Sequence, residues 1–171
     1  IQFFRYVANM LQGDLGVSYS ISKNTPITQL LQTRLPTSLR IGAQAILLGT
    51  AVGLVLGVVA ALKHNSFWDT LCTAVSVLGV SVPSYVFALF LAYLCGFRLG
   101  WFPQLYQMAH PLLSSILPSA ALSVFTIASV ARFARGELLE VLGSDYMLLA
   151  ASKGLPKPLL IVRHALRNAL I

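Results

Sequence analysis

Charged side chains are scarce in this sequence. Of its 171 residues only 10% are charged, whereas 57% are hydrophobic. A soluble domain usually carries about 25% charged residues, and a soluble fold of this composition would lack the charge needed to cover its surface. The scarcity of charge therefore excludes an ordinary soluble domain and favours a membrane protein.

Residues that bind metals or perform catalysis are also few. The two cysteines, Cys72 and Cys95, lie in apolar stretches without metal-ligand spacing, so we predict that they are small core or lipid-facing residues. The three histidines, His64, His110 and His164, are far apart in the sequence, so we predict surface or interface residues rather than metal ligands. The sequence has neither a Gly-rich phosphate-binding loop ending in Lys-Ser/Thr nor a His-Glu-x-x-His motif. We therefore predict no catalytic site, no cofactor and no metal.

The charges that are present are mostly basic. Twelve Lys and Arg residues stand against five acids, a formal net charge of +7. Nucleic-acid binding would require basic residues clustered on a soluble module with a recognisable motif. Here they flank apolar stretches, which suits anionic membrane surfaces and cytoplasmic loops. We expect membrane lipid as a partner, and no nucleic acid.

Three apolar stretches are long enough to cross a bilayer, which takes about 20 helical residues. The predicted transmembrane segments are residues 39–62, 70–97 and 112–135. In the first of them, glycines recur every four residues at 49, 53 and 57 and share one helix face, a spacing that permits close helix packing in lipid. The predicted fold class is all-α, a polytopic membrane protein built as a transmembrane helix bundle.

The second apolar stretch contains a helix-breaking proline. Pro83 removes one backbone hydrogen bond and clashes with the preceding turn, so we predict a kink there. Such breaks are tolerated in lipid where protein or a wet cavity satisfies the freed backbone groups. Two interpretations stay open: Ser81, Pro83, Ser84 and Tyr85 line a translocation pathway, or the kink serves packing alone.

Residues 1–38 precede the first predicted span. Phe3, Val7 and Met10 fall on one face of a short amphipathic helix that ends at Gly13, and a loop rich in Gly, Ser and Asn follows. Three spans place this segment on one side of the membrane and the C-terminal tail on the other. Seven basic residues on the tail side against five opposite favour a cytoplasmic tail, but this count alone does not settle the orientation.

The chain ends in DYMLLAASKGLPKPLLIVRHALRNALI, a basic segment interrupted by Gly and Pro. Ser144 is placed to cap a helix that starts with Asp145, whose negative charge suits the positive helix N-terminus. Gly154 fits the position just after that helix, Pro156 prevents its continuation, and Pro158 fits the first turn of another. The sequence therefore predicts two short helices joined by a tight turn.

The second of these helices is predicted to be amphipathic. Its apolar face is formed by Leu159, Val162, Leu166 and Leu170. Arg163 and Arg167 lie one turn apart and repel each other, so the helix gains from an acidic partner or from anionic lipid. The alternatives of a partner protein and the membrane surface stay open on this pattern.

These residues resemble a known family. The C-terminal segment is similar to the EAA loop of permeases from ATP-binding-cassette importers, and most similar to the oligopeptide, dipeptide and nickel branch, with D-Y-x-x-x-A-x-x-K-G-L followed by H-x-L-R-N-A-L. Further stretches agree in order: GDLGVS at 13–18, RLPTSLRIG at 34–42, SVPSYV at 81–86, LGWFP at 99–103, ILPSAALS at 116–123 and ARFARGELLEVL at 131–142. The resemblance covers nearly the whole chain.

The resemblance implies a transmembrane permease subunit of an ATP-driven importer of oligopeptides. Family members have six spans, so one span is expected before Ile1 and two after Ile171. It also implies that residues 1–38 are extracytoplasmic, that residues 136–171 form the cytoplasmic coupling loop, and that the protein lies in the cytoplasmic membrane of a prokaryote. The implied partners are a second permease subunit, two ATP-binding-cassette subunits that hydrolyse ATP, and an extracytoplasmic substrate-binding protein.

Carried onto this sequence, the resemblance implies a docking site for the ATPase subunit. Its residues would be Asp145, Tyr146, Ala150, Gly154, Leu155, His164, Arg167 and Asn168. Recognition would follow the helix-in-groove mode. The sequence departs from the family pattern at Leu148 and Ala151, where this branch often has Arg, and the closing Pro would follow Ile171.

Three other functions are compatible with parts of the sequence. A permease of the same branch could carry dipeptides, nickel or another small solute. A secondary transporter would carry intramembrane acids or bases, and none lies in the uncharged cores 41–62, 70–97 and 112–131. A membrane scaffold without transport activity would leave the kinked second span and the hydroxyl-rich third without a task beyond packing.

Overall fold

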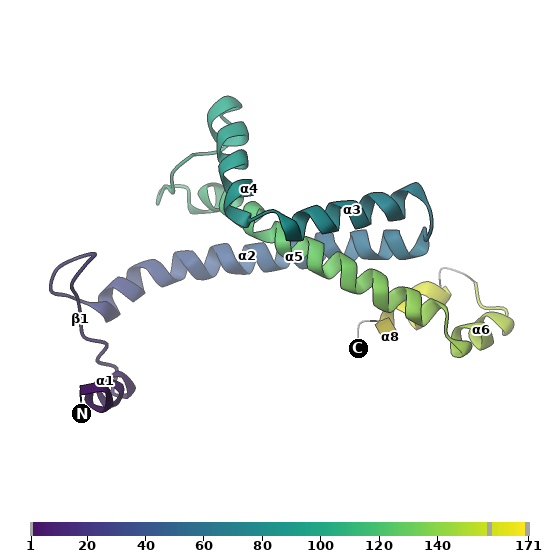
Figure 1. The fold of residues 1–171 in the computed structure, drawn as a ribbon, viewed down its shortest axis with the longest axis horizontal. Helices are drawn as coiled ribbons and strands as arrows, with labels where there is room; N and C mark the ends of the chain where they lie inside the picture. The colour runs from purple at the N-terminus through teal and green to yellow at the C-terminus, as the bar shows by residue number, and fades with distance from the viewer. Residues whose placement is uncertain (1, 157–158, 170–171) are drawn as a thin grey trace. The chain divides into compact units, whose positions relative to one another are not determined.

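A computed structural model describes residues 2–156 and 159–169, and its elements are almost all helical (Figure 1). This composition confirms the predicted all-α class. The chain divides into two compact units, residues 1–42 and residues 43–171.

The first unit differs from the predicted loop. The helix predicted at the start of the chain is present as α1 (Gln2–Leu11), but β1 (Val17–Ser18) and β2 (Thr25–Pro26) follow it as a small antiparallel hairpin. Helix α2 (Ile27–Leu62) then begins well before residue 39 and continues through Pro36. One missing hydrogen bond at Pro36 does not end this helix, because each further residue adds a bond once a helix has formed.

The second unit holds the rest of α2 and all later elements. These are α3 (Phe67–Ser81), α4 (Ser84–Leu91), the π-helix η1 (Ala92–Arg98), α5 (Pro111–Leu142), α6 (Asp145–Ser152), the π-helix η2 (Leu160–Leu166) and α8 (Arg167–Ala169). Helix α5 is the centre of the unit: α3, α4, η2 and α8 all pack against it.

Within the described residues, the two helices α2 and α5 are long and apolar enough to cross a membrane. Helix α3 with α4 and η1 makes a third span if the bent pair is one span. The predicted kink at Pro83 is confirmed. The chain bends there by 101°. Val82 adopts an extended conformation (φ −89°, ψ 126°) directly before Pro83, as the proline ring requires of its predecessor. The break therefore separates two helices.

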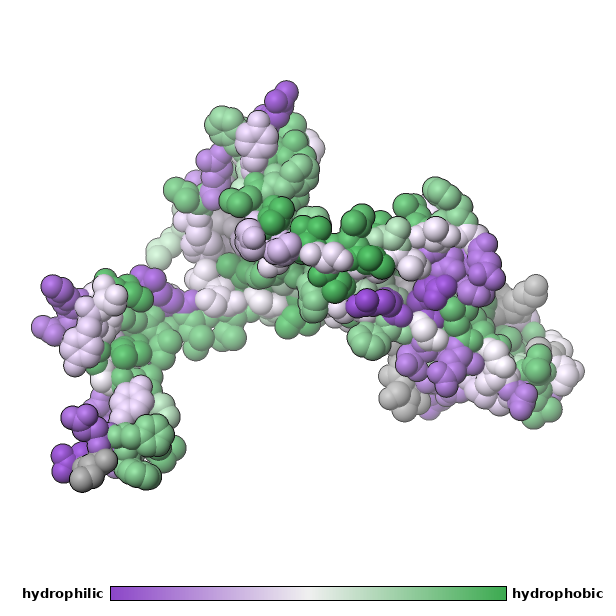
Figure 2. Space-filling model, viewed as in Figure 1, coloured by the Kyte–Doolittle hydropathy of each residue, from purple (hydrophilic) through white to green (hydrophobic). Residues whose placement is uncertain are grey.

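The surface of the spans is apolar. Large side chains such as Leu47, Leu89 and Phe133 face outward, and Figure 2 shows apolar residues along the helices of the second unit, with polar residues gathered around the turn between α2 and α3 and near α6. Contiguous exposed apolar surface of this extent marks contact with lipid or protein. The exposed apolar surface is therefore consistent with helices that cross a membrane.

The predicted small-residue packing is confirmed, since the face of α2 that carries Gly49, Gly53 and Gly57 lies directly on α5. A Cβ atom added at Gly57 would stand 2.6 Å from the carbonyl oxygen of Ala131, and one at Gly53 would stand 2.8 Å from that of Ile127. Only glycine permits this approach of the two backbones.

The close contact between α2 and α5 predicts that replacing glycine by alanine has a different effect on stability at Gly57 than at Gly42. We expect Gly57→Ala to reduce the free energy of unfolding by about 1–3 kcal/mol, the usual cost of overpacking. Gly42→Ala, where no atom lies within 4 Å of the added methyl, should be neutral or stabilising by up to about 1 kcal/mol, because alanine favours helix. Chemical unfolding in detergent micelles measures both; equal effects would contradict the packing.

Candidate functional site

The C-terminal segment from Asp145 to Ala169 folds back onto the end of α5. Its anchor is a core in which Met147 and Ala165 pack with Ala61 from α2 and Leu138 from α5, all four buried. Because this core joins two short elements to two long helices, the segment is held by apolar packing.

The turn within this segment has the predicted conformation. Gly154 follows α6 with φ +77°, a left-handed conformation that glycine adopts without penalty. The predicted Ser144 cap is wrong for the side chain, because the Ser144 hydroxyl donates to the carbonyl of Val141 instead. Only the Ser144 backbone carbonyl accepts the first amides of α6, those of Met147 and Leu148.

The predicted apolar face of the second helix is correct only in part, because Leu166 packs against this core but two other members of the face do not. Val162 is 64% exposed and Leu159 is 40% exposed, whereas Ala165 is fully buried. The cause is the π-helical conformation of η2, whose i→i+5 spacing puts Leu160 and Ala165, rather than Leu159 and Val162, toward the core. Pro158 and Leu170 lie outside the described residues.

The structure brings three of the predicted docking residues together. The side-chain amide of Asn168 donates to the Tyr146 hydroxyl (2.9 Å), which in turn donates to the carbonyl of His164 (3.4 Å). These bonds join α6 to η2 and α8. Of the other predicted docking residues, Asp145, Gly154 and Arg167 are exposed, and Ala150 and Leu155 are half-buried.

These bonds predict a local effect of Tyr146→Phe. The change removes the acceptor for Asn168 and the donor to His164, and a hydrogen bond contributes about 0.5–1.5 kcal/mol net. We expect faster hydrogen exchange in α6 and little change in α5. Tyr19→Phe, at a hydroxyl exposed in the first unit, is the control, and unchanged exchange in α6 would contradict the proposed link.

The residues predicted to line a pathway all lie at the break between α3 and α4. Ser81, Pro83, Ser84 and Tyr85 are exposed. The Ser81 hydroxyl donates to the carbonyl of Val77 at 2.8 Å, within its own helix. The break thus presents hydroxyl groups at the surface of the chain.

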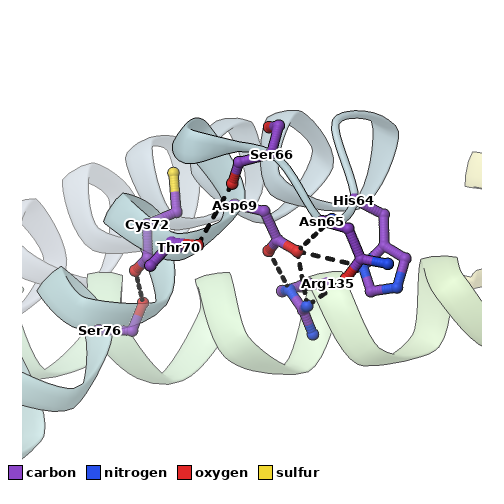
Figure 3. A network of polar contacts seen from close by, with 8 residues as sticks. All are labelled: His64, Asn65, Ser66, Asp69, Thr70, Cys72, Ser76 and Arg135. Carbon is purple, nitrogen blue, oxygen red and sulfur yellow. Dashed lines mark hydrogen bonds and ion pairs between the residues drawn. The ribbon is translucent and has the colours of Figure 1, made fainter.

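A network of polar contacts around Asp69 in the second unit was missed by sequence reasoning (Figure 3). Asp69, in the first turn of α3, is 4% exposed. Its carboxylate accepts from both Nε and Nη2 of Arg135 on α5, the latter at 2.8 Å, and from the backbone amide of Asn65 at 3.0 Å; it also contacts Nδ1 of His64 at 3.1 Å. Paired charge-assisted bonds of this kind are strong and orient both groups.

One signal in the sequence could have pointed to this cluster. Asp69 is the sole acid between Asp14 and Glu137, and an isolated acid at the end of an apolar helix requires a cationic partner if it is buried. Which of the basic residues would meet it depends on the packing of α3 on α5.

Comparison with known families then decides what kind of chain this is. The family described as "Binding-protein-dependent transport system inner membrane component" matches residues 53–171. The chain belongs to this family. The membership, with the apolar helices, confirms the predicted resemblance and the polytopic all-α membrane fold.

Curated relatives of the same family match 99% of the chain. The dipeptide transport system permease protein DppB of Lactococcus lactis subsp. cremoris is 41% identical over 170 residues. The oligopeptide transport system permease proteins OppB of Salmonella typhimurium and Escherichia coli K12 are 39% and 38% identical over the same length. The chain spans 55% of the length of each of these relatives.

Proposed function

We propose that the chain is part of the transmembrane permease subunit of an ATP-driven importer of oligopeptides in the cytoplasmic membrane of a prokaryote. Family membership and the names of the oligopeptide permeases support this proposal. The observation that carries it is the segment 145–169, a compact element anchored on α5 that leaves apolar and basic side chains exposed. Such a surface is suited to a partner with an apolar groove and an acidic rim.

In this proposal ATP hydrolysis takes place in two separate ATP-binding-cassette subunits. The docking surface comprises the predicted residues Asp145, Tyr146, Ala150, Gly154, Leu155, His164, Arg167 and Asn168. Exposure of Leu148 and Leu149 adjacent to them supports an apolar contact. A second permease subunit and an extracytoplasmic substrate-binding protein complete the transporter.

Motion of the ATPase subunits would reach the pathway through the helices. The segment 145–169 moves with the end of α5, and rigid-body motion of packed elements is an established means of switching access. The hydroxyls at Ser81, Ser84 and Tyr85 are the proposed pathway residues, because a broken span is tolerated where it lines a cavity. Residues 1–38 lie outside the cytoplasm and residues 136–171 inside it.

A second substrate class has an observation in its favour. The relative from Lactococcus lactis, which carries the name of a dipeptide permease, is 41% identical, as similar as the oligopeptide permeases. Competition for uptake by peptides of two to six residues separates the two substrate classes. Preference for peptides of two residues would overturn the oligopeptide assignment and leave the importer assignment intact.

The docking surface can be tested by cross-linking. A cysteine at Leu155 in a Cys72→Ser, Cys95→Ser background of the full-length protein, in membranes with its ATPase subunit, is expected to capture that subunit. The control is Leu47→Cys, at an exposed position within the apolar span of α2. Gly154→Pro, which alters the turn, should abolish uptake. Failure to capture the ATPase together with unaffected uptake would refute an importer and favour a scaffold or a secondary transporter.

A further inference from the structure

The Asp69–Arg135 ion pair lies between two parts of the second unit to which the proposed function gives different roles. These are the segment 145–169, proposed for docking, and the break at Pro83, proposed for the pathway. Arg135 lies on α5 three residues before Leu138, which packs in the core that holds the segment 145–169. The Arg135 guanidinium donates to the carboxylate of Asp69 on α3. One turn of α5, residues 135–138, therefore contacts both the C-terminal segment and the start of α3.

The turn between α2 and α3 is fixed to the same place. Asn65 takes a left-handed conformation (φ +59°) and donates its amide to the Asp69 carboxylate, and His64 adds a third contact to that carboxylate. Ala61, three residues before His64, belongs to the core with Leu138. The end of α2, the start of α3 and the end of α5 are thus held together by hydrogen bonds, an ion pair and apolar packing (Figure 3).

Helix α3 connects this region to the break. It runs from Phe67 to Ser81 along α5, where the face of Gly79 lies so close to Ala128 that an added Cβ would stand 2.9 Å from its methyl. The break at Pro83 follows directly. A displacement of the segment 145–169 can pass along this continuous packed path, because close-packed helices transmit rather than absorb small shifts.

We propose that Asp69 and Arg135 act as positioning residues that couple movement of the segment 145–169 to α3 and to the break at Pro83. This inference rests on the proposed function. A polar pair is suited to this task, since its paired geometry fixes the orientation of α3 against α5, whereas apolar contacts allow sliding. The pair is oriented by Asn65 and His64.

The rival interpretation is a pair that contributes to folding alone. In that case, loss of the pair lowers the amount of assembled transporter but leaves each assembled transporter fully coupled. The ratio of substrate transported to ATP hydrolysed separates the two interpretations, because it is independent of how much protein folds.

The test uses the full-length permease in the complete transporter, reconstituted in liposomes with its substrate-binding protein and peptide. Asp69→Asn keeps the shape of the side chain and its acceptor for Asn65 but removes the charge. We expect it to lower peptide transported per ATP by about 2- to 30-fold, the range seen for residues in coupling networks, while ATP hydrolysis per assembled complex persists. The exchange Asp69→Arg with Arg135→Asp should restore part of the ratio. The control is Arg132→Gln, which removes an exposed basic residue from the same helix and should leave the ratio unchanged.

Two results would overturn the proposal. If assembled Asp69→Asn transporters keep the wild-type ratio, the pair has only a folding role and the importer function stands. If the wild-type transporter itself shows no ATP-dependent uptake of peptide, the proposed function fails and the coupling role fails with it. Should Asp69→Asn not assemble, Asp69→Glu keeps the charge but shifts the carboxylate by one methylene, and the same fall in the ratio is expected.

Discussion

Leu138→Ala is expected to detach the C-terminal segment from the membrane helices. Leu138 is 1% exposed and packs among Ala61, Met147 and Ala165. Truncating a fully buried leucine removes its transfer free energy and leaves a cavity, which together cost about 2–5 kcal/mol. Ala61 and Ala165 are too small to fill the space left behind, whereas the flexible side chain of Met147 can fill part of it. We therefore expect a loss within this range.

The effect should be local as well as large. Hydrogen exchange in α6 and η2 is expected to rise to that of a segment without tertiary contacts, while α3 and the first half of α5 keep their protection. The matched control is Leu122→Ala on the same helix, whose side chain is 47% exposed and leaves no cavity. If both variants unfold alike in detergent micelles, the segment does not depend on this core.

Arg135→Ala is expected to have the second large effect. It leaves the Asp69 carboxylate, which is 6% exposed, without its cationic partner. Breaking a buried pair by removing one member costs about 3–5 kcal/mol, because the remaining charge is buried and uncompensated. His64 and the Asn65 amide still contact the carboxylate and do not replace two charge-assisted bonds.

A double variant distinguishes the cost of the orphaned charge from the contribution of the pair. Asp69→Leu with Arg135→Leu removes both charges, and replacement of a buried pair by apolar side chains is often neutral or stabilising. We therefore expect the double variant to recover most of the stability lost in Arg135→Ala. Chemical unfolding followed by circular dichroism measures all variants. A double variant as unstable as the single one would show that the pair itself, rather than the orphaned charge, holds α3 on α5.

Much of the fold could be predicted because membrane composition is restrictive. Uncharged stretches of sufficient length, the proline at 83 and the glycines of α2 each have one dominant physical consequence in a helix. The same holds for Gly154, whose left-handed conformation follows from its position after α6. These features act within one element or between two regular helices, so their outcome does not depend on details elsewhere in the chain.

The candidate site was predicted less completely. The residues around Asp145 and Gly154 were identified from their resemblance to a family motif, but the buried face of η2 was not. A 3.6-residue period placed Leu159 and Val162 on the apolar face, whereas the π-helix buries Ala165. The helix takes the spacing that fits its contacts with Leu138 and Met147, and these contacts come from distant parts of the sequence.

Residue patterns alone were enough to predict the membrane class, the helical architecture, the break at Pro83 and the tight turn at Gly154. Each follows from local backbone sterics or from the cost of placing polar groups in lipid. The ion pair between Asp69 and Arg135 and the burial of Ala165 in the C-terminal core could not be predicted in this way. Such pairings depend on how α3 and the C-terminal segment pack on α5, because burial and partner choice arise only when elements far apart in the chain come together.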